Sequence, residues 1–421
     1  MITTLSLCPG VTLRCCRDLR FKQGALSIQF LRPMTAEEAP LNALLPAVLL
    51  RGSREYPDLR AITLKLDDLY GASVSALVRR IGDCQTTGFY SAFLEDRFAL
   101  SGDRILAPMT EFLGQLLLEP LTEAGAFRRD FVESEKKNLI STIESELNDK
   151  RAYAAGQLLR TMCREDSFGI PRLGDKKRVA EITPQSLYEH YRKVLRQSPV
   201  ELFYVGAAQP EDAARALKPM FAGMERQPLP APVQTPFRDC GGNDRTETME
   251  VAQAKLCMGF VTPITNRDPR FAAMQVTNAL FGAGQTSKLF MNIREKMSLC
   301  YSIGSGYYGS KGILTVSAGI DADKDKVTRE EILRQLDACR RGDFTQEELS
   351  AAKEGILSGL RGVHDSPVAI EGYYATAAIS GLGYTPGTYM QAVEQVTAEQ
   401  VRQAAQTISL HTTYLLTGVQ P

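Results

Sequence analysis

The sequence lacks an excess of charge of either sign. It contains 49 Lys and Arg residues against 49 Asp and Glu residues, so its formal net charge is zero. Proteins that bind nucleic acid or an anionic membrane surface usually carry a basic excess or a basic stripe. The balance of charge therefore argues against both kinds of partner, and we expect recognition to depend on shape.

Long apolar runs are lacking as well. The longest stretch, residues 41–50, is interrupted by Asn42 and Pro46 and falls far short of the roughly 20 residues that a membrane-spanning helix needs. Residues 1–20 show no basic region ahead of an apolar block and no small-residue cleavage site, so no secretory signal is predicted. We therefore expect a cytoplasmic protein without a membrane segment.

Cysteine pairs at metal-binding spacing are missing too. The nine cysteines are an odd number and none forms a C-x-x-C pair, which is typical of reduced thiols in a reducing compartment. Cys8, Cys15 and Cys16 lie close together in the sequence and could in principle hold a metal. Their spacing matches no zinc-binding pattern, so we interpret them as ordinary thiols.

Length, composition and a weak internal repeat indicate two similar domains. The 421 residues, of which 44% are hydrophobic and 23% charged, are too many for one ordinary core and are typical of globular proteins. Segments 182–187 and 396–401 resemble each other, each with a Thr as the predicted N-cap of a helix. Segments 200–206 and 412–418, and 137–140 and 353–356, match at nearly the same offset. Three weak matches on one diagonal predict a duplicated chain.

The boundary between the copies is predicted at a proline-rich stretch. Residues 227–236 show neither helical nor strand periodicity and indicate a semi-rigid linker. We therefore predict domains at 1–224 and 241–421 with a linker at 225–240. Strand patterns such as 85–94 and 312–320 alternate with amphipathic helical patterns such as 108–118 and 346–360. This mixture predicts α+β domains, each a mostly antiparallel sheet with helices packed on one face.

The most specific motif lies in the second half. Residues 287–302 (SKLFMNIREKMSLCYS), preceded by Phe281-Gly-Ala-Gly284, resemble the C-terminal domain of the insulinase-like zinc peptidases, the pitrilysin-type or inverzincin family M16. That family is built from duplicated α+β domains joined by a linker, in agreement with the repeat. The resemblance extends over essentially the whole chain and implies the insulinase-like fold.

The resemblance also implies that the zinc site of the family is lost. Active members carry an H-x-x-E-H helix in the N-terminal domain, followed by a basic residue and a glycine. Arg51-Gly52 fits this landmark, and the positions of His, Glu and His are then taken by Ala43, Pro46 and Ala47. The family's distal Glu ligand corresponds to Glu133. A catalytic zinc needs about three protein ligands, so we expect no metal on this chain and no independent peptidase activity.

Two observations from the residues alone support this expectation. The three histidines, His190, His364 and His411, lie far apart and show no ligand pattern. Proline inside a helix costs about 3 kcal/mol, so we expect the helix at 41–50 to be altered at Pro46 or to begin near it. Without the resemblance, this segment is simply a core helix, and we prefer that interpretation.

Active members of the family use an Arg and a Tyr, seven residues apart, from the C-terminal domain, and Arg294 and Tyr301 have this spacing. A tyrosyl hydroxyl can donate to the scissile carbonyl as it becomes an oxyanion, and a guanidinium can hold the substrate backbone. Spacing alone would favour a helix-surface charge and a half-buried strand aromatic. Because the surrounding motif is intact, we expect Arg294 and Tyr301 to act catalytically together with a partner.

A chain without zinc ligands that keeps this pair resembles one half of a split peptidase. In several bacterial members, one subunit supplies H-x-x-E-H and the other supplies the Arg and Tyr. This chain resembles the second kind, in particular the bacterial YfmF type, a branch associated with 5-aminopentanol modification of elongation factor P. The resemblance thus implies a heterodimer with zinc on the partner and a peptide or unfolded protein as substrate. The alternative is a non-enzymatic scaffold or assembly protein of the same fold.

A short glycine-rich segment precedes the motif. In related processing peptidases a glycine-rich loop at this place touches substrate, so the resemblance implies that Gly282 and Gly284 bind substrate. A phosphate-binding loop is the other interpretation, but no GK[ST] follows and no strand signature of a nucleotide site precedes. We therefore predict a flexible turn ahead of a helix that begins near Ser287.

Overall fold

The computed structural model describes residues 2–418, which form two compact units. Unit 1 comprises the chain up to Ile143, Ile170–Val233 and His364–Thr376. Unit 2 comprises Glu144–Gly169, Gln234–Val363 and the chain from Ala377 onward. Each unit therefore contains a segment from the other half of the sequence, and residues 225–240 contain neither helix nor strand.

Unit 1 is built on a six-stranded sheet in which only the β2·β8 pair is parallel. The strands in spatial order are β1 (Ile2–Cys8), β2 (Val11–Arg17), β8 (Val200–Gly206), β3 (Gln23–Pro33), β5 (Cys84–Leu94) and β4 (Ser73–Ile81). Leu26, Ile28 and Phe30 alternate along β3 and point into the main core of the unit. The residues between them face the other side of the sheet, where the side chains of Ser27 and Gln29 are also buried.

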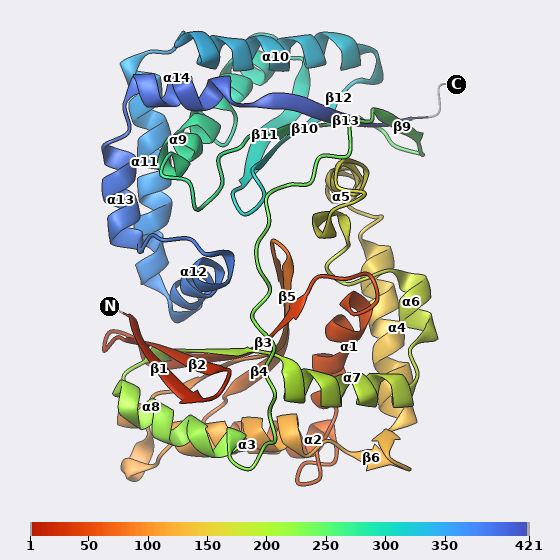
Figure 1. Ribbon diagram of the computed structural model, residues 1–421, viewed down its shortest axis with the longest axis vertical. Coiled ribbons are helices and arrows are strands. Elements are labelled where there is room, and N and C mark those ends of the chain that lie inside the picture. Colours follow the sequence, from red (N-terminus) through yellow and green to blue (C-terminus); the bar gives the residue numbers. More distant parts are fainter. Residues whose placement is uncertain (1, 419–421) are drawn as a thin grey trace. The chain divides into compact units, whose positions relative to one another are not determined.

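Helices cover the apolar face of this sheet. They are α1 (Ala39–Leu49), α2 (Leu59–Asp68), α3 (Leu106–Leu118), α4 (Arg129–Ser145), α6 (Lys176–Glu181), α7 (Pro184–Gln197) and α8 (Pro210–Leu217), and a two-stranded ribbon joins β6 (Thr122–Glu123) to β7 (Ala126–Phe127). Figure 1 shows α3 and α8 on one side of the sheet. Thr183 begins α7 with a capping box, as predicted for an N-cap residue.

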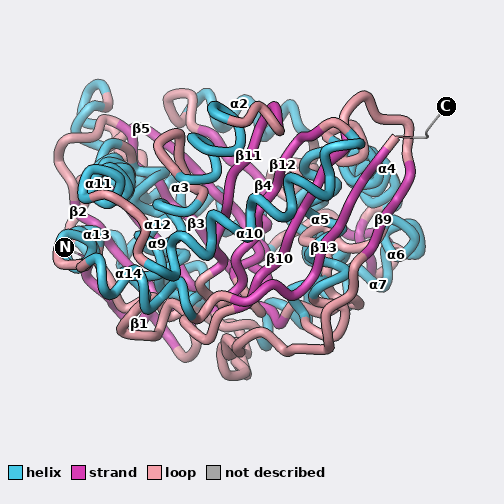
Figure 2. The backbone as a smooth tube through the Cα atoms, turned by 90° about the horizontal axis from the view of Figure 1, so that it is seen from above, coloured by secondary structure: helices cyan, strands magenta, loops and turns pink. Residues whose placement is uncertain are grey.

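Unit 2 repeats this plan with a five-stranded sheet. Its strands in spatial order are β11 (Cys300–Tyr308), β12 (Ile313–Ile320), β10 (Ala254–Val261), β13 (Ser409–Thr417) and β9 (Arg245–Thr248), and only β13·β9 is parallel. Figure 2 shows β10, β13 and β9 running side by side. The helices are α9 (Phe271–Phe281), α10 (Asp325–Arg341), α11 (Gln346–Gly362), α13 (Pro386–Glu394) and α14 (Ala398–Gln406). Thr397 is the N-cap of α14, as predicted, and forms a capping box with Gln400.

A helix from the first half of the sequence covers the second face of the unit 2 sheet. It is α5 (Lys150–Met162), whose Ala154 and Leu158 pack with Tyr414 and other buried side chains of β10 and β13. Figure 1 shows α10 and α14 on one side of this sheet and α5 on the other. A Cβ at Gly259 would lie 2.6 Å from the sulfur of Met162, so the glycine in β10 makes the notch that this side chain fills.

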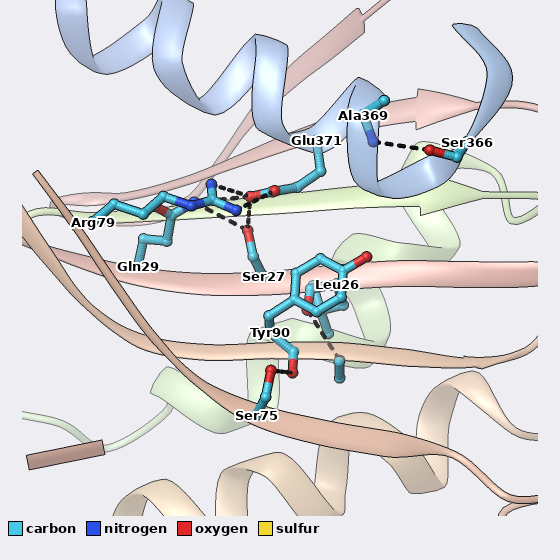
Figure 3. A network of polar contacts seen from close by, with 10 residues as sticks. Leu26, Ser27, Gln29, Ser75, Arg79, Tyr90, Ser366, Ala369 and Glu371 are labelled. Atoms are coloured by element: carbon cyan, nitrogen blue, oxygen red, sulfur yellow. Dashed lines mark hydrogen bonds and ion pairs between the residues drawn. The ribbon is translucent and has the colours of Figure 1, made fainter. Parts of the chain in front are cut away.

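A helix from the second half of the sequence covers the second face of the unit 1 sheet in the same way. It is α12 (Pro367–Ser380), whose Ile370 packs on β3 and β8. The neighbouring Glu371 is fully buried. Its carboxylate accepts hydrogen bonds from Ser27 Oγ at 2.7 Å, from Gln29 Nε2 at 3.0 Å and from two nitrogens of Arg79 at 2.9 and 2.7 Å (Figure 3). Four hydrogen bonds thus offset the cost of burying this carboxylate.

The predicted α+β class with antiparallel-rich sheets is confirmed. The prediction placed helices on one face of each sheet. In the structure the other face is covered as well, by α12 in unit 1 and by α5 in unit 2. These contacts join residues far apart in the sequence, and local periodicity carries no information about them. Among the described residues, no helix combines the length and the apolar character that crossing a membrane requires.

Candidate functional site

The three positions that correspond to His, Glu and His of the H-x-x-E-H motif lie in α1 and belong to a packed helix. Ala43 and Pro46 are buried and Ala47 is half-buried. Ala43 belongs to the main core of unit 1 together with Leu44, Leu45 and Val48. Beside Pro46 the structure leaves a cavity of only about 10 Å³, lined mostly by apolar side chains. That is no more than about one water molecule occupies, so the surroundings of Pro46 are closely packed.

The helix does not begin near Pro46, so that part of the prediction was wrong. The helix runs from Ala39 to Leu49 with Pro46 inside it. Proline lacks the N–H that would donate to the carbonyl of Asn42 four residues earlier. Thr87 on β5 replaces this donor, since its Oγ1 lies 2.8 Å from the Asn42 carbonyl oxygen. A contact from a distant strand therefore offsets part of the local cost of proline.

Asn42, the residue before Ala43, belongs to a buried network of polar side chains. Asn42 donates from Nδ2 to Gln85 Oε1 at 2.9 Å and accepts at Oδ1 from His190 Nε2 at 2.7 Å. Burial lowers the pKa of His190 to about 4, so the ring is neutral at pH 7. Sequence reasoning left His190 without a partner, because Asn42 is 148 residues away. This histidine is a core residue held by an amide.

The remaining carboxylate, Glu133, lies on α4 beside a lysine. Lys136 Nζ lies 3.2 Å from Glu133 Oε1 and also donates to the carbonyl of Ile182 at 2.7 Å. A cation in this place neutralises the carboxylate and competes with any metal. Within the part of the chain that the structure describes, no three His, Cys, Asp or Glu side chains gather in a metal-binding arrangement. The residues at the family's zinc position therefore do not fit the metal.

Arg294 lies in unit 2 on an unusual helix. Residues Leu289–Lys296 form a π-helix, η5, where an ordinary helix was expected. Met297 N donates to the carbonyl of Asn292, five residues earlier, at 3.1 Å. The guanidinium of Arg294 lies over the ring of Phe290 at 4.6 Å, and its nearest carboxylate is that of Glu295 at 3.6 Å. Stretches of π-helix are rare and often occur at functional sites.

Tyr301 is the extra residue of a β-bulge. Cys300 pairs with Ile320 and Ser302 pairs with Gly319, so no residue of β12 lies opposite Tyr301. A bulge redirects a side chain out of the regular alternation of the sheet. Tyr301 is 57% exposed, in contrast to the half-buried strand aromatic of the alternative interpretation. Its hydroxyl donates to Asp321 Oδ1 at 3.2 Å.

Arg294 and Tyr301 belong to adjoining elements, since η5 packs against β11. The charge of Arg294 acts on Cys300, the residue before Tyr301: it partly offsets the burial that raises the pKa of this thiol to about 11. The described contacts include no hydrogen bond between Arg294 and Tyr301. Both side chains point away from the core, the Arg294 side chain being 41% exposed.

The two predicted substrate-binding glycines differ in their surroundings. Gly282 donates to the Asn278 carbonyl and accepts from Ser305 N on the edge strand β11, both at 2.9 Å. A Cβ at Gly282 would lie 2.6 Å from Leu289 and 2.7 Å from the Ser305 hydroxyl, so packing alone requires a glycine there. Gly284 has open space around it. Binding of substrate by Gly282 and Gly284 stays a prediction, and Gly284 is the better placed of the two.

Comparison with known proteins agrees with this picture. A family model described as peptidase M16 inactive domain matches residues 181–356. A Bacillus subtilis (strain 168) protein named probable inactive metalloprotease YmfF is 29% identical over 411 residues, which cover 98% of this chain and 96% of that protein. This similarity agrees with the resemblance to that bacterial type, whose name is YmfF.

Solved structures share the fold over the whole chain. The crystal structure of a conserved protein from Enterococcus faecalis V583 superposes with a TM-score of 0.91 at 26% identity and covers 100% of this chain and 99% of that one. A peptidase M16 inactive domain from Pseudomonas fluorescens superposes with a TM-score of 0.81 at 18% identity, with coverage of 100% and 98%. The chain therefore has the fold of these M16 proteins, is similar over nearly its whole length to a probable inactive metalloprotease, and matches the M16 inactive-domain model over residues 181–356.

Proposed function

We propose that this chain is the zinc-deficient, substrate-handling subunit of a heteromeric insulinase-like metallopeptidase. It would supply Arg294 and Tyr301 to a partner chain that carries the H-x-x-E-H helix and its zinc. The observation that carries the proposal is a contrast within the chain. The metal positions are filled and packed, whereas Arg294 and Tyr301 are exposed on a π-helix and a bulge.

The chemistry of the pair suits peptide hydrolysis that another chain initiates. As a peptide carbonyl is attacked, its oxygen gains negative charge, and a hydroxyl that donates to this oxygen stabilises the transition state. Tyr301 carries such a hydroxyl on an exposed ring. The guanidinium of Arg294 offers several N–H donors in one plane, which suits a peptide carbonyl or carboxylate. Neither role needs a metal on this chain.

The expected substrate is a peptide or an unfolded protein segment. The Tyr301 hydroxyl and the Arg294 guanidinium can both donate to main-chain carbonyl oxygens, which every peptide has. An extended backbone exposes these oxygens, so such a backbone is the expected ligand. The link to modification of elongation factor P stays a prediction that follows from the resemblance only.

The test reconstitutes the pair of chains. The partner is a family M16 chain of similar length with an intact H-x-x-E-H helix, encoded in the same genome and preferably beside this one. Each chain is assayed alone and mixed in equal amounts, with an unstructured fluorogenic peptide as substrate. We expect cleavage only by the mixture, with loss of cleavage when a chelator removes the partner's zinc.

Two outcomes would count against the proposal. Full activity of the H-x-x-E-H chain alone would mean that it needs no second subunit. A stable complex with no cleavage of any peptide would favour the alternative, a non-enzymatic scaffold or assembly protein, in which Arg294 and Tyr301 have no catalytic part.

A further inference from the structure

The hydroxyl of Tyr301 has one proton, and the structure directs it to Asp321. This carboxylate follows the last residue of β12, directly beyond the pair Cys300 and Ile320, and therefore lies next to the bulge. The distance from Tyr301 Oη to Asp321 Oδ1 is 3.2 Å. It is the one hydrogen bond described for this otherwise exposed side chain.

Asp321 is itself held from a second side. Lys324 Nζ lies 2.8 Å from Asp321 Oδ2, and the Lys324 amide donates to the Asp321 carbonyl at 3.0 Å, which closes a short turn. The hydrogen bond from Lys324 is the main cause that keeps the pKa of Asp321 below its usual range. At neutral pH this carboxylate is ionised, so it accepts hydrogen bonds and donates none.

We propose that Asp321 is a positioning residue for Tyr301, which anchors the ring on the bulge and holds the hydroxyl proton until a peptide carbonyl competes for it. The inference rests on the proposed function. Arg294 has a comparable support in the ring of Phe290 beneath its guanidinium. Each of the two exposed site residues therefore contacts a neighbouring side chain, Phe290 within the sequence motif and Asp321 beyond it.

The geometry gives Asp321 two opposed effects. Anchoring the ring favours catalysis, because an oxyanion donor acts best when it is already in place. Holding the proton opposes catalysis, since the O–H must turn away from an ionised acceptor before it can donate to substrate. An asparagine at 321 separates the two effects. Its amide N–H can donate to the Tyr301 oxygen, which keeps the anchor and leaves the hydroxyl proton free.

The first experiment tests the contact in this chain alone. Tyrosine labelled with ¹³C at Cζ is incorporated, and the Tyr301 signal is identified by its absence in Tyr301→Phe. We expect Asp321→Asn to shift this signal. Asp323→Asn is the matched control, because it removes the same charge from an exposed position in the same turn without touching Tyr301. An unchanged Tyr301 signal in Asp321→Asn overturns the inference.

The second experiment measures peptide cleavage by the reconstituted complex. We expect Asp321→Asn to raise kcat roughly three- to tenfold with KM unchanged, the size of effect that the net free energy of one ordinary hydrogen bond has on a rate. Asp321→Ala, which releases the proton but also the ring, should give a lower kcat than Asp321→Asn. Asp323→Asn should match the wild type. Equal rates for wild type, Asp321→Asn and Asp321→Ala overturn the inference.

Tyr301→Phe distinguishes this failure from failure of the proposed function. If Tyr301→Phe loses turnover while the Asp321 variants behave as wild type, the proposed function stands and only the positioning role is wrong. If Tyr301→Phe cleaves as fast as the wild type, the catalytic role of Tyr301 is wrong, and the positioning role falls with it.

Discussion

The two regions that the resemblance relates to the catalytic parts of the M16 peptidases differ in opposite ways. In unit 1, the segment around Ala43 and Pro46 is a buried helix whose polar groups are satisfied by Thr87, Gln85 and His190. In unit 2, the segment around Arg294 and Tyr301 keeps exposed side chains on irregular backbone. In α1, side chains that pack in the core therefore stand where the resemblance places zinc ligands. Core packing does not explain why η5 is a π-helix or why β11 has a bulge at Tyr301.

This contrast predicts that changes in the two regions are detected by different measurements. Substitutions around α1 should alter the free energy of unfolding and leave the substrate chemistry alone. Substitutions at Arg294 and Tyr301 should alter turnover or substrate binding and leave stability nearly unchanged. A variant that shows the reverse behaviour would break the comparison.

The largest effect is expected for Tyr301→Phe. Removal of one oxyanion donor costs about 10²- to 10³-fold in kcat, whereas an exposed ring that loses only its hydroxyl keeps its packing. The measurement is peptide cleavage by the reconstituted complex at matched occupancy, together with the melting temperature of the isolated chain. Arg294→Ala should instead raise KM, and both variants should still bind the H-x-x-E-H subunit. If Tyr301→Phe cleaves peptide as fast as the wild type, Tyr301 has no catalytic role, and the two regions no longer differ in this respect.

A smaller effect, on stability, is expected from the protonation of His190. Its folded pKa of about 4 lies below the unfolded value near 6.5, so its contribution is complete above pH 6.5 and is lost as the pH falls from there to about 4. The full loss amounts to about 3 kcal/mol of unfolding free energy. Urea denaturation between pH 7 and pH 4.5 should show a shallower pH dependence for His190→Gln than for wild type.

His364→Gln is the control for this experiment, because His364 lies in a short turn outside the core. It should keep the wild-type pH dependence. Identical profiles for wild type and His190→Gln would mean that the buried ring does not remain neutral, and the network around α1 would then need another account.

A third effect, of about 1–2 kcal/mol, is expected at the proline in α1. Thr87→Val keeps the shape of the side chain but leaves the Asn42 carbonyl without its donor. Pro46→Ala returns an N–H to the helix, so Thr87→Val should cost less in a Pro46→Ala background than in wild type. The double-mutant cycle in urea denaturation measures this coupling. Additive costs would show that Thr87 does not compensate for the proline.

The smallest effect concerns metal. We expect purified protein to carry no stoichiometric zinc, and its melting temperature to be the same with and without a chelator, since Ala43, Pro46 and Ala47 offer no ligand atoms. Elemental analysis of the dialysed chain is the measurement. One tightly bound zinc per chain would contradict the loss of the site.

Part of the fold and of the site could be predicted because the signals are local. The helix N-caps at Thr183 and Thr397 are short-range patterns that backbone hydrogen bonding imposes on neighbouring residues. The absence of ligands at Ala43, Pro46 and Ala47 is likewise a matter of which atoms the side chains contain. These features, together with the α+β class, were determined by the sequence itself.

Only the tertiary structure decided the rest, because it depends on partners far away along the chain. Pro46 stays inside its helix through Thr87 on a strand, His190 stays neutral through burial beside Asn42, and Glu371 is held by Arg79 across 292 residues. Tyr301 is exposed because Cys300 and Ser302 pair with consecutive residues of β12. Such contacts have no periodicity that a local pattern can reveal, since what selects them is the free energy of burying and pairing groups that only the folded chain brings together.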